Sequence, residues 1–280
     1  MKLYTTALAL FFLVAGVRAD TISIGTAGPF AVLGHAGVTN TGPSLIFGSV
    51  SGSTVTPAVT GFTFSTSPGP GLVFPPGVGF TTGVSTPFTD AGTAYTFAQA
   101  TPGAFNLTGS VLGSGGTVTS LLAGVYSFSS SASLAGILSL DAGGTDNASW
   151  IFQIGSSLTT ASASGIQIVN AGAAGPYTGS ITWAVGSAAT LGTTTKFLGT
   201  IISQAGSTLN TGATVGCGRV ISLNGSVTLD SNVIDTPADC SVTGGMVGPP
   251  ASIPSAVPEP AAFAMVSMGL LAALVLKARR

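Results

Sequence analysis

A repeat of about 19 residues is the feature that most constrains this chain. The segment GTIISQAGSTLN at 199–210 aligns with GRVISLNGSVTLD at 218–230, so matching Gly, Ile and Ser residues lie 19 positions apart. Leu191, Leu209 and Leu229 follow at steps of 18 and 20 residues, each directly after a threonine. Repeats of this length are typical of stacked coils, in which each turn buries its apolar edge against the next. Short β-branched runs between Gly, Asn and Ser residues indicate that the coils are built from strands.

Side-chain alternation along these coils predicts columns of hydroxyl groups on the outside. If Leu209 and Val215 point inward, Thr208 and Thr214 point outward, because successive side chains of a strand face opposite sides. Adjacent strands lie about 4.8 Å apart, so each column would repeat at that spacing. The segment SSLTT at 156–160 is interpreted as one more copy. The first column is then Ser157, Thr190, Thr208 and Thr228, and the second is Thr160, Thr193, Thr211 and Ser231. Ordinary β-propensity also accounts for threonine on exposed strands.

Charge is scarce, at 5% of 280 residues and a formal net charge of −1. The chain is nevertheless rich in Val, Ile, Leu, Phe and Thr, so it can bury a core, unlike a disordered chain. It offers no basic patch for phosphates, which excludes nucleic acid as a partner. Between residues 20 and 256 the basic residues are Lys196 and Arg219, and His35 is the one histidine of the chain. Because catalysis requires a base and charge-stabilising groups in one cleft, we predict no enzymatic activity, no cofactor and no metal site.

Two motifs admit both a structural and a ligand-binding interpretation. Asp141 and Asp146, in DAGGTDNAS, could share a Ca²⁺ ion with backbone carbonyls, but Gly, Asp and Asn favour an Asx-type turn. Trp150 and Trp183 lie in the apolar runs WIFQI and ITWAV, which predicts core positions rather than ligand platforms.

The segment TPFTDAGTAYTFAQATPG at 86–103 departs from the strand pattern. Asp90 is a possible N-cap, Pro102 follows the last residues of the pattern, and alanine and aromatic residues lie between them. We predict a helix here, with a strand and loop as the alternative.

The N-terminus, MKLYTTALALFFLVAGVRA, predicts a secretory signal peptide at 1–19. Lys2 precedes an apolar run from Ala7 to Val14, and cleavage after Ala19 would start the mature chain at Asp20. The alternative is an N-terminal anchor helix, for which the apolar run is short.

The C-terminus resembles the bacterial PEP-CTERM sorting signal. Pro258, Glu259 and Pro260 are followed by an apolar stretch at 261–276 and a basic tail. The resemblance implies recognition by an exosortase, removal of the tail and export; a plain membrane anchor is the alternative. The expected organisation is a signal peptide at 1–19, a solenoid domain at 20–242, a Gly/Pro-rich linker at 243–256 and the sorting signal at 257–280.

An exported chain with two cysteines is expected to form a disulfide between Cys217 and Cys240. Such a bridge would stabilise the fold by roughly 3 kcal/mol on the chain-entropy model. Sequons at Asn106, Asn147 and Asn224 are expected to stay unmodified in a bacterium.

Four long segments resemble the microbial ice-binding-like proteins: residues 30–44, 124–164, 183–203 and 208–234, with the helical segment at 90–103 also similar. The resemblance implies a right-handed discontinuous β-solenoid with a triangular cross-section, one helix packed alongside, and coils that are not stacked in chain order. It also implies an ice-binding face with clusters of four residues: Thr, then Ala or Gly, then any residue, then Thr or Asn. Thr211 to Thr214 fit that form and Thr160 to Ala163 fit only its start. Thr193 to Lys196 fit poorly, because Lys196 stands where a small residue is expected.

We therefore predict a secreted or surface-displayed bacterial protein that binds ice through a flat threonine-rich face. Threonine carries a methyl and a hydroxyl group, and its χ1 is stiff, so its side chain loses little conformational entropy on binding. Because the threonine recurs in every coil, many weak contacts with ice add up. The candidate residues are Thr190, Thr193, Thr208, Thr211, Thr214, Thr228 and Ser231. The alternative is a non-catalytic adhesion protein of the cell surface or exopolysaccharide matrix, without ice activity.

Overall fold

The computed structural model describes residues 21–52, 80–82, 84–172 and 178–236 of the chain. The chain divides into two compact units, residues 1–249 and 250–280, and every described residue lies in the first. The expected signal peptide, linker and sorting signal, and Cys240, lie outside the described residues.

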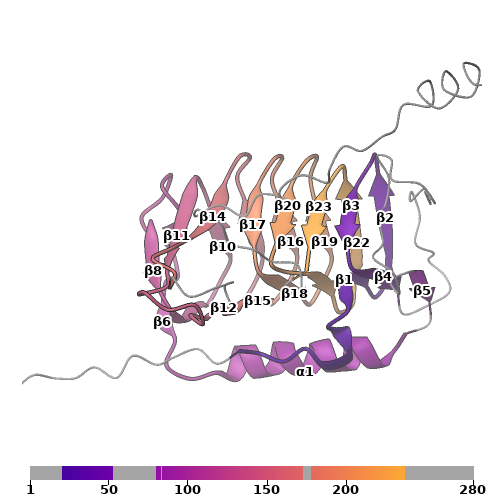
Figure 1. Cartoon of the computed structure of the whole chain (residues 1–280), viewed down its shortest axis with the longest axis horizontal. Coiled ribbons are helices and arrows are strands. Elements are labelled where there is room, and N and C mark those ends of the chain that lie inside the picture. The colour runs from indigo at the N-terminus through magenta and orange to yellow at the C-terminus, as the bar shows by residue number, and fades with distance from the viewer. Residues whose placement is uncertain (1–20, 53–79, 83, 173–177, 237–280) are drawn as a thin grey trace, which may run out of the picture. The chain divides into compact units, whose positions relative to one another are not determined.

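Within these ranges the chain forms three sheets of parallel strands, which we call sheets A, B and C. The order in sheet A is β5 (Phe80–Thr82), β4 (Ser49–Gly52), β1 (Phe30–Gly34), β21 (Val220–Ser222), β18 (Thr200–Ser203), β15 (Ile181–Val185), β12 (Trp150–Ile154), β9 (Gly124–Phe128) and β6 (Phe105–Asn106). The order in sheet B is β2 (Gly37–Thr41), β22 (Ser226–Asp230), β19 (Ser207–Leu209), β16 (Ala189–Leu191), β13 (Leu158–Thr160), β10 (Ala132–Leu134) and β7 (Val111–Leu112). The order in sheet C is β3 (Leu45–Phe47), β23 (Val233–Asp235), β20 (Thr214–Gly216), β17 (Lys196–Leu198), β14 (Gly165–Val169), β11 (Ile137–Asp141) and β8 (Ser120–Leu122). Each complete coil supplies one strand to each sheet, which confirms the predicted three-sided β-solenoid (Figure 1).

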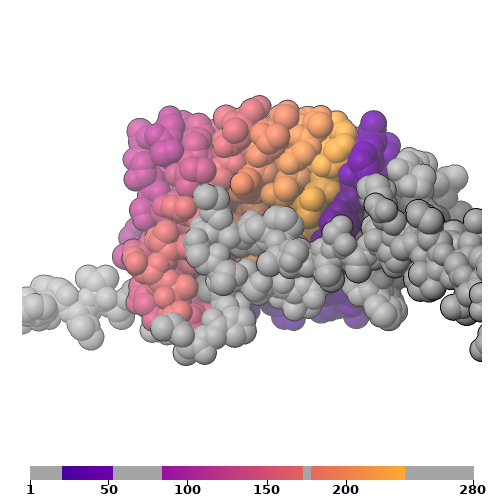
Figure 2. Space-filling model, turned by 45° about the horizontal axis from the view of Figure 1, so that its top comes forward, coloured from indigo at the N-terminus to yellow at the C-terminus, as the bar shows by residue number. Residues whose placement is uncertain are grey.

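The coils are not stacked in the order of the chain. The N-terminal strands β1, β2 and β3 pair with β21, β22 and β23, the last strands of the described chain. Figure 2 shows the result: the bands run from magenta through orange to yellow, and the indigo N-terminal coil lies beside the yellow one. The helix α1 connects the two ends of the stack, so that the coils from β6 onward build back toward the first (Figure 1). This arrangement confirms the coil order that the family resemblance implied.

Apolar side chains from successive coils fill the interior. The rings of Tyr126, Phe152, Trp183 and Phe197 follow one another, with centroids 5.6, 3.7 and 5.0 Å apart. Trp183 and Trp150 are both fully buried, and their indole N–H groups donate to main-chain carbonyls at 3.0 and 3.3 Å. Buried indoles need such a partner, and the pairing confirms that both tryptophans are core residues.

One helix covers the outer face of sheet A. It buries a stripe of mostly small side chains, Phe88, Ala91, Ala94 and Ala98, against Leu33, Val125, Ile151, Ala184, Ile202 and Ile221 of the sheet. Gln153 on β12 donates from Nε2 to the carbonyls of Ala98 and Thr101 at 2.9 and 2.6 Å. These contacts cover the outer face of sheet A, whereas α1 leaves the outer faces of sheets B and C uncovered.

The helix α1 spans Thr86–Ala100, which confirms the helix predicted within 86–103. It begins after Ser85, and Pro87 lies in the first turn, where a missing N–H breaks no helical hydrogen bond. Pro102 follows its end, as expected. At 15 residues it is the longest helix of the described segments, and none of them is long and apolar enough to cross a membrane.

Asp90 is not the N-cap of this helix, contrary to the prediction. It lies inside α1, and its carboxylate accepts hydrogen bonds from the hydroxyl and the main-chain N–H of Thr26, at 2.6 and 2.8 Å. These bonds, with the hydroxyl contributing most, lower the pKa of Asp90 from its ordinary value of 3.8. Asp90 therefore ties α1 to the short 3-10 helix η1 (Gly25–Ala27).

Candidate functional site

A column of threonines runs along the outer face of sheet B. Parallel pairing sets Thr159 beside Thr190, Thr190 beside Thr208, Thr208 beside Thr228, and Thr228 beside Thr39. Five neighbouring strands thus each contribute one threonine, about 4.8 Å from the next, which is the spacing of paired strands. Four of the five side chains are exposed, and that of Thr190 is partly exposed.

The hydroxyls of this threonine column are available to solvent. In the described part of the chain, none of the five has a hydrogen-bond partner. Leu191 and Leu209, the residues next to Thr190 and Thr208, are buried in the core and hold the strands in place. Because threonine is stiff at χ1, the column presents methyl and hydroxyl groups at fixed positions.

Short side chains flank the threonine column on both sides. Two residues before the column stand Ser157, Ala188, Gly206 and Ser226, and two residues after it stand Ala161, Gly192, Asn210 and Asp230. Asp230 is the one charged residue in that set, and its carboxylate accepts hydrogen bonds from the hydroxyls of Thr211 and Ser231. The face is therefore low in relief and nearly free of charge.

The corner between sheets B and C repeats the same backbone shape in successive coils. In four successive coils, a residue of this corner has a positive φ: Ala163, Thr194, Gly212 and Ser231, at 57°, 56°, 71° and 54°. They are joined from coil to coil by hydrogen bonds from their N–H groups, including Thr194 to the carbonyl of Thr211 at 3.0 Å and Gly212 to that of Asp230 at 3.0 Å. The regular corner leaves Thr193 and Thr211 exposed beside the threonine column.

The residues predicted from the sequence fall in three places. Thr190, Thr208 and Thr228 share one column, as the repeat predicted. Thr193 and Thr211 lie at the corner between sheets B and C.

Thr214 and Ser231 lie apart from the threonine column. Thr214 begins β20 in sheet C, where it pairs with Lys196, so it belongs to a different side of the solenoid. Ser231 has a positive φ, as Gly212 does, and the N–H of Gly212 donates to the carbonyl of Asp230, so Ser231 takes the corner position of Gly212 in the next coil. The predicted second column had placed Ser231 beside Thr211.

Two assignments from the segment SSLTT are wrong. Thr159, not Ser157, pairs with Thr190, and the hydroxyl of Ser157 lies 2.9 Å from that of Ser131. Thr160 points into the solenoid, where it is 4% exposed and its hydroxyl lies 2.8 Å from that of Thr195. The alignment had matched Leu158 to Leu191, whereas Leu158 pairs with Ala189. Ala189 and Leu191 are both buried, so the apolar pattern alone does not distinguish a register that pairs Leu158 with Ala189 from one that pairs it with Leu191.

Thr39 and Thr159 were missed by the sequence analysis. The segment GVTNT at 37–41 contains three β-branched residues, which favours a strand, and in the structure it alternates between buried and exposed residues after its first position. Its neighbour in space, β22, lies at the other end of the domain sequence, and no periodicity in the sequence indicated that pairing.

The acidic loop at 141–149 forms a turn. Asp141 accepts hydrogen bonds from the main-chain N–H of Gly143 at 2.9 Å and from the side chain of Asn170 at 3.0 Å. This is the predicted Asx-type turn. The described segments contain no group of three or more His, Cys, Asp or Glu side chains able to hold a metal ion.

The ionisable groups considered for catalysis are dispersed. Arg219 donates from Nε and Nη2 to the carbonyl of Gly28 at 2.8 and 2.5 Å, and its burial lowers its pKa to about 10. Lys196 is exposed on sheet C, while the ring of His35 packs edge-on against Phe88 with centroids 5.2 Å apart. Each therefore occupies a separate structural environment.

Cys217 is disulfide-bonded in the structure. It follows β20 and has a positive φ of 49°. The other cysteine of the chain, Cys240, lies outside the described residues, so the pairing itself stays a prediction.

Comparison with known proteins gives a consistent result. Residues 32–235 match the family model described as Ice-binding-like. An ice-binding protein of Nostoc sp. (strain HG1) is 44% identical over 220 residues, which cover 78% of this chain and 75% of the relative. An ice-binding protein of Flavobacterium frigoris (strain PS1) is 32% identical over 234 residues, or 80% of this chain and 79% of the relative.

Solved structures share the fold. The crystal structure of an ice binding protein from an Antarctic biological consortium superposes with a TM-score of 0.66 and 30% identity, covering 84% of this chain and 95% of the other. That of the ice-binding protein from the Antarctic ascomycete Antarctomyces psychrotrophicus gives a TM-score of 0.62 and 30% identity, covering 80% and 100%.

Proposed function

This chain belongs to the Ice-binding-like family, and from that premise we propose that it binds ice through the outer face of sheet B. The observation that supports this face above the others is the threonine column of Thr39, Thr159, Thr190, Thr208 and Thr228, whose hydroxyls lack partners within the described chain. Sheet A is occupied by α1, and sheet C carries Lys196 in the row that includes Thr214.

A face of this kind suits a solid water surface. Its methyl groups gain from leaving liquid water, and its hydroxyls replace hydrogen bonds to water with bonds to ice. The side chains are already ordered, so binding costs little conformational entropy. Each contact is weak, but a row of five fixed by one rigid sheet engages together, as in multivalent binding.

We infer a contact surface wider than the column itself. Thr193 and Thr211 lie at the border of the column and are exposed. The hydroxyl of Thr211 donates a hydrogen bond to the carboxylate of Asp230, which compensates part of its negative charge. Thr214 and Ser231 are assigned to the rim of the site at most, since Thr214 belongs to sheet C and Ser231 is committed to Asp230.

We propose that the protein acts outside the cell without catalysis, cofactor or metal. The proposal rests on the sequence of the two ends: a signal peptide at 1–19, a mature domain at 20–242, a linker at 243–256 and a PEP-CTERM-type signal at 257–280. Recognition of Pro258, Glu259 and Pro260 by an exosortase would release the tail after transient anchoring. The product would be secreted, or displayed on a bacterial surface within the exopolysaccharide layer.

Ice shaping and recrystallisation inhibition by the purified protein test the proposed function. At micromolar concentration, the protein should facet a growing ice crystal and keep small crystals from coarsening, while an unrelated soluble protein at equal concentration should not. Coarsening at the rate of the control protein would refute ice binding and favour the adhesion role instead.

A further inference from the structure

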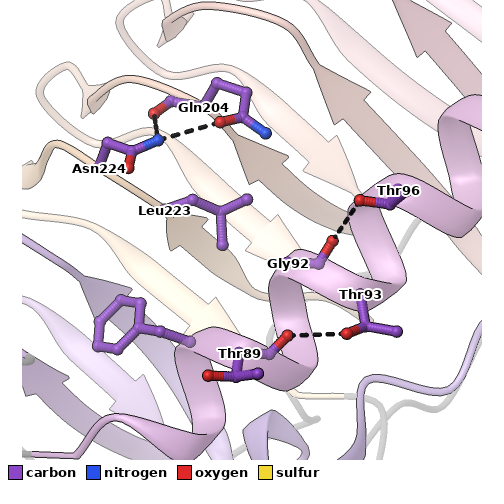
Figure 3. A pocket seen from close by; sticks show the side chains of 8 residues that line it. Thr89, Gly92, Thr93, Thr96, Gln204, Leu223 and Asn224 are labelled. Carbon is purple, nitrogen blue, oxygen red and sulfur yellow. Dashed lines mark hydrogen bonds between the residues drawn. The ribbon is translucent and has the colours of Figure 1, made fainter.

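A groove separates α1 from the corner that joins sheets A and B (Figure 3). Its volume is about 540 Å³, within the roughly 300–1,000 Å³ typical of small-molecule sites. One wall is the helix, with Thr89, Thr93 and Thr96 on it, and the other consists of the turns that carry Gln204 and Asn224. The groove lies on a different side from the threonine column, and the function proposed above does not use it.

The helical wall presents hydrogen-bond acceptors. The hydroxyl of Thr93 donates to the carbonyl of Thr89 at 3.0 Å, and that of Thr96 donates to the carbonyl of Gly92 at 2.9 Å (Figure 3). Because each hydroxyl proton is used within the helix, the remaining lone pairs of these oxygens accept from a ligand. All three threonines are exposed.

The opposite wall presents a fixed pair of amides. Asn224 donates from Nδ2 to the main-chain carbonyl of Gln204 at 2.9 Å and to its Oε1 at 3.0 Å (Figure 3). This pairing leaves Nε2 of Gln204 as a donor and Oδ1 of Asn224 as an acceptor. The main-chain N–H groups of Gln204 and Leu223 are already paired with neighbouring coils, at 2.9 and 2.8 Å, so the side chains are what the wall offers.

Gly92 keeps the groove open. Glycine is among the least favourable residues in a helix interior, and it is normally retained there when a neighbour approaches closely. Here a Cβ at position 92 would meet nothing within 4 Å, so packing does not require glycine. What the missing side chain provides is space opposite Leu223, which projects from the corner turn toward the helix (Figure 3).

We propose that this groove binds a neutral polysaccharide chain. No acidic or basic residue is among those that line it, which disfavours ions and uronic acids. Acceptors on one wall and a donor–acceptor amide pair on the other match the many hydroxyls of a sugar, and Leu223 provides an apolar surface for its C–H face. A peptide is less suited, because β18 and β21, the described strands that end at the groove, are each paired on both sides and offer no free edge for main-chain pairing.

Titration of the isotope-labelled protein with maltohexaose and with cellohexaose, followed by amide NMR shifts, tests the proposal. We expect saturable shifts at Gln204, Asn224 and the first turns of α1 with at least one of the two. Gly92→Leu should fill the groove with a good helix former, weaken binding at least tenfold and leave the melting temperature equal or higher. Asn224→Ala, at an exposed position, should also weaken binding.

Ala100→Leu is the matched control, since it adds the same side chain to an exposed position of α1 outside the groove. It should bind like the wild type. Thr208→Tyr should also bind sugar normally, while Gly92→Leu should retain full ice activity, so the two sites fail separately. The proposal is overturned if neither hexasaccharide produces saturable shifts, if Gly92→Leu and Asn224→Ala both bind as wild type, or if an oligogalacturonate or an unstructured peptide binds the groove more tightly.

Discussion

Replacing Thr208 with tyrosine should remove most of the ice activity without disturbing the fold. Thr208 is the middle strand position between Thr190 and Thr228, one strand spacing from each. A tyrosine stands well above its short neighbours, so a flat solid loses contact with all three of these threonines. If the methyl group of each of the three threonines counts as one buried CH₂ group, at about 0.8 kcal/mol each, the loss is about 2.4 kcal/mol, or roughly 50-fold in affinity.

The assay is the protein concentration needed to inhibit ice recrystallisation, measured beside the melting temperature. Thr208 is exposed on a strand, and tyrosine is a good strand residue, so stability should change by less than about 0.5 kcal/mol. Ser120→Tyr, at an exposed position of sheet C, controls for adding a tyrosine, and Thr214→Tyr tests whether sheet C takes part. Both should keep full activity. Full activity in folded Thr208→Tyr, or an equal loss in Ser120→Tyr, would refute sheet B as the binding face.

Two further predictions concern stability. Reducing the disulfide of Cys217, or changing Cys217→Ser, should lower the free energy of unfolding, measured by denaturant melts, by about 3 kcal/mol. The folded protein should keep its ice activity. Two free thiols in the folded, exported protein would contradict the pairing with Cys240. The hydrogen bonds from Thr26 lower the pKa of Asp90, so their contribution is fully present above the ordinary value of 3.8 and is lost as the pH falls through the lowered one. The difference in melting temperature between wild type and Asp90→Asn should therefore shrink below pH 3.8, and a constant difference would argue against this contact.

The sequence alone was sufficient for the local parts of this protein. The repeat of about 19 residues placed Thr190, Thr208 and Thr228 on one outer column, because consecutive coils of nearly equal length carry equivalent residues into register. Apolar runs placed Trp150 and Trp183 in the core, and the helix within 86–103 followed from its composition and from Pro102. Each of these features depends on residues near one another in the chain.

The tertiary structure decided which segments pair with one another and which side chains and sheet faces are exposed. Thr39 joins the column beside Thr228 because the N-terminal coil is inserted after the last one, a pairing that no local pattern encodes. Thr160 points inward because Thr159, its neighbour on β13, is the residue paired with Thr190 on the outside, and successive side chains of a strand face opposite sides. The helix α1 covers the outer face of sheet A, and the groove beside Gly92 exists only because this helix packs near corners that are far from it in sequence. Periodicity reports which side chains are equivalent, whereas the neighbours of each coil depend on the path of the whole chain.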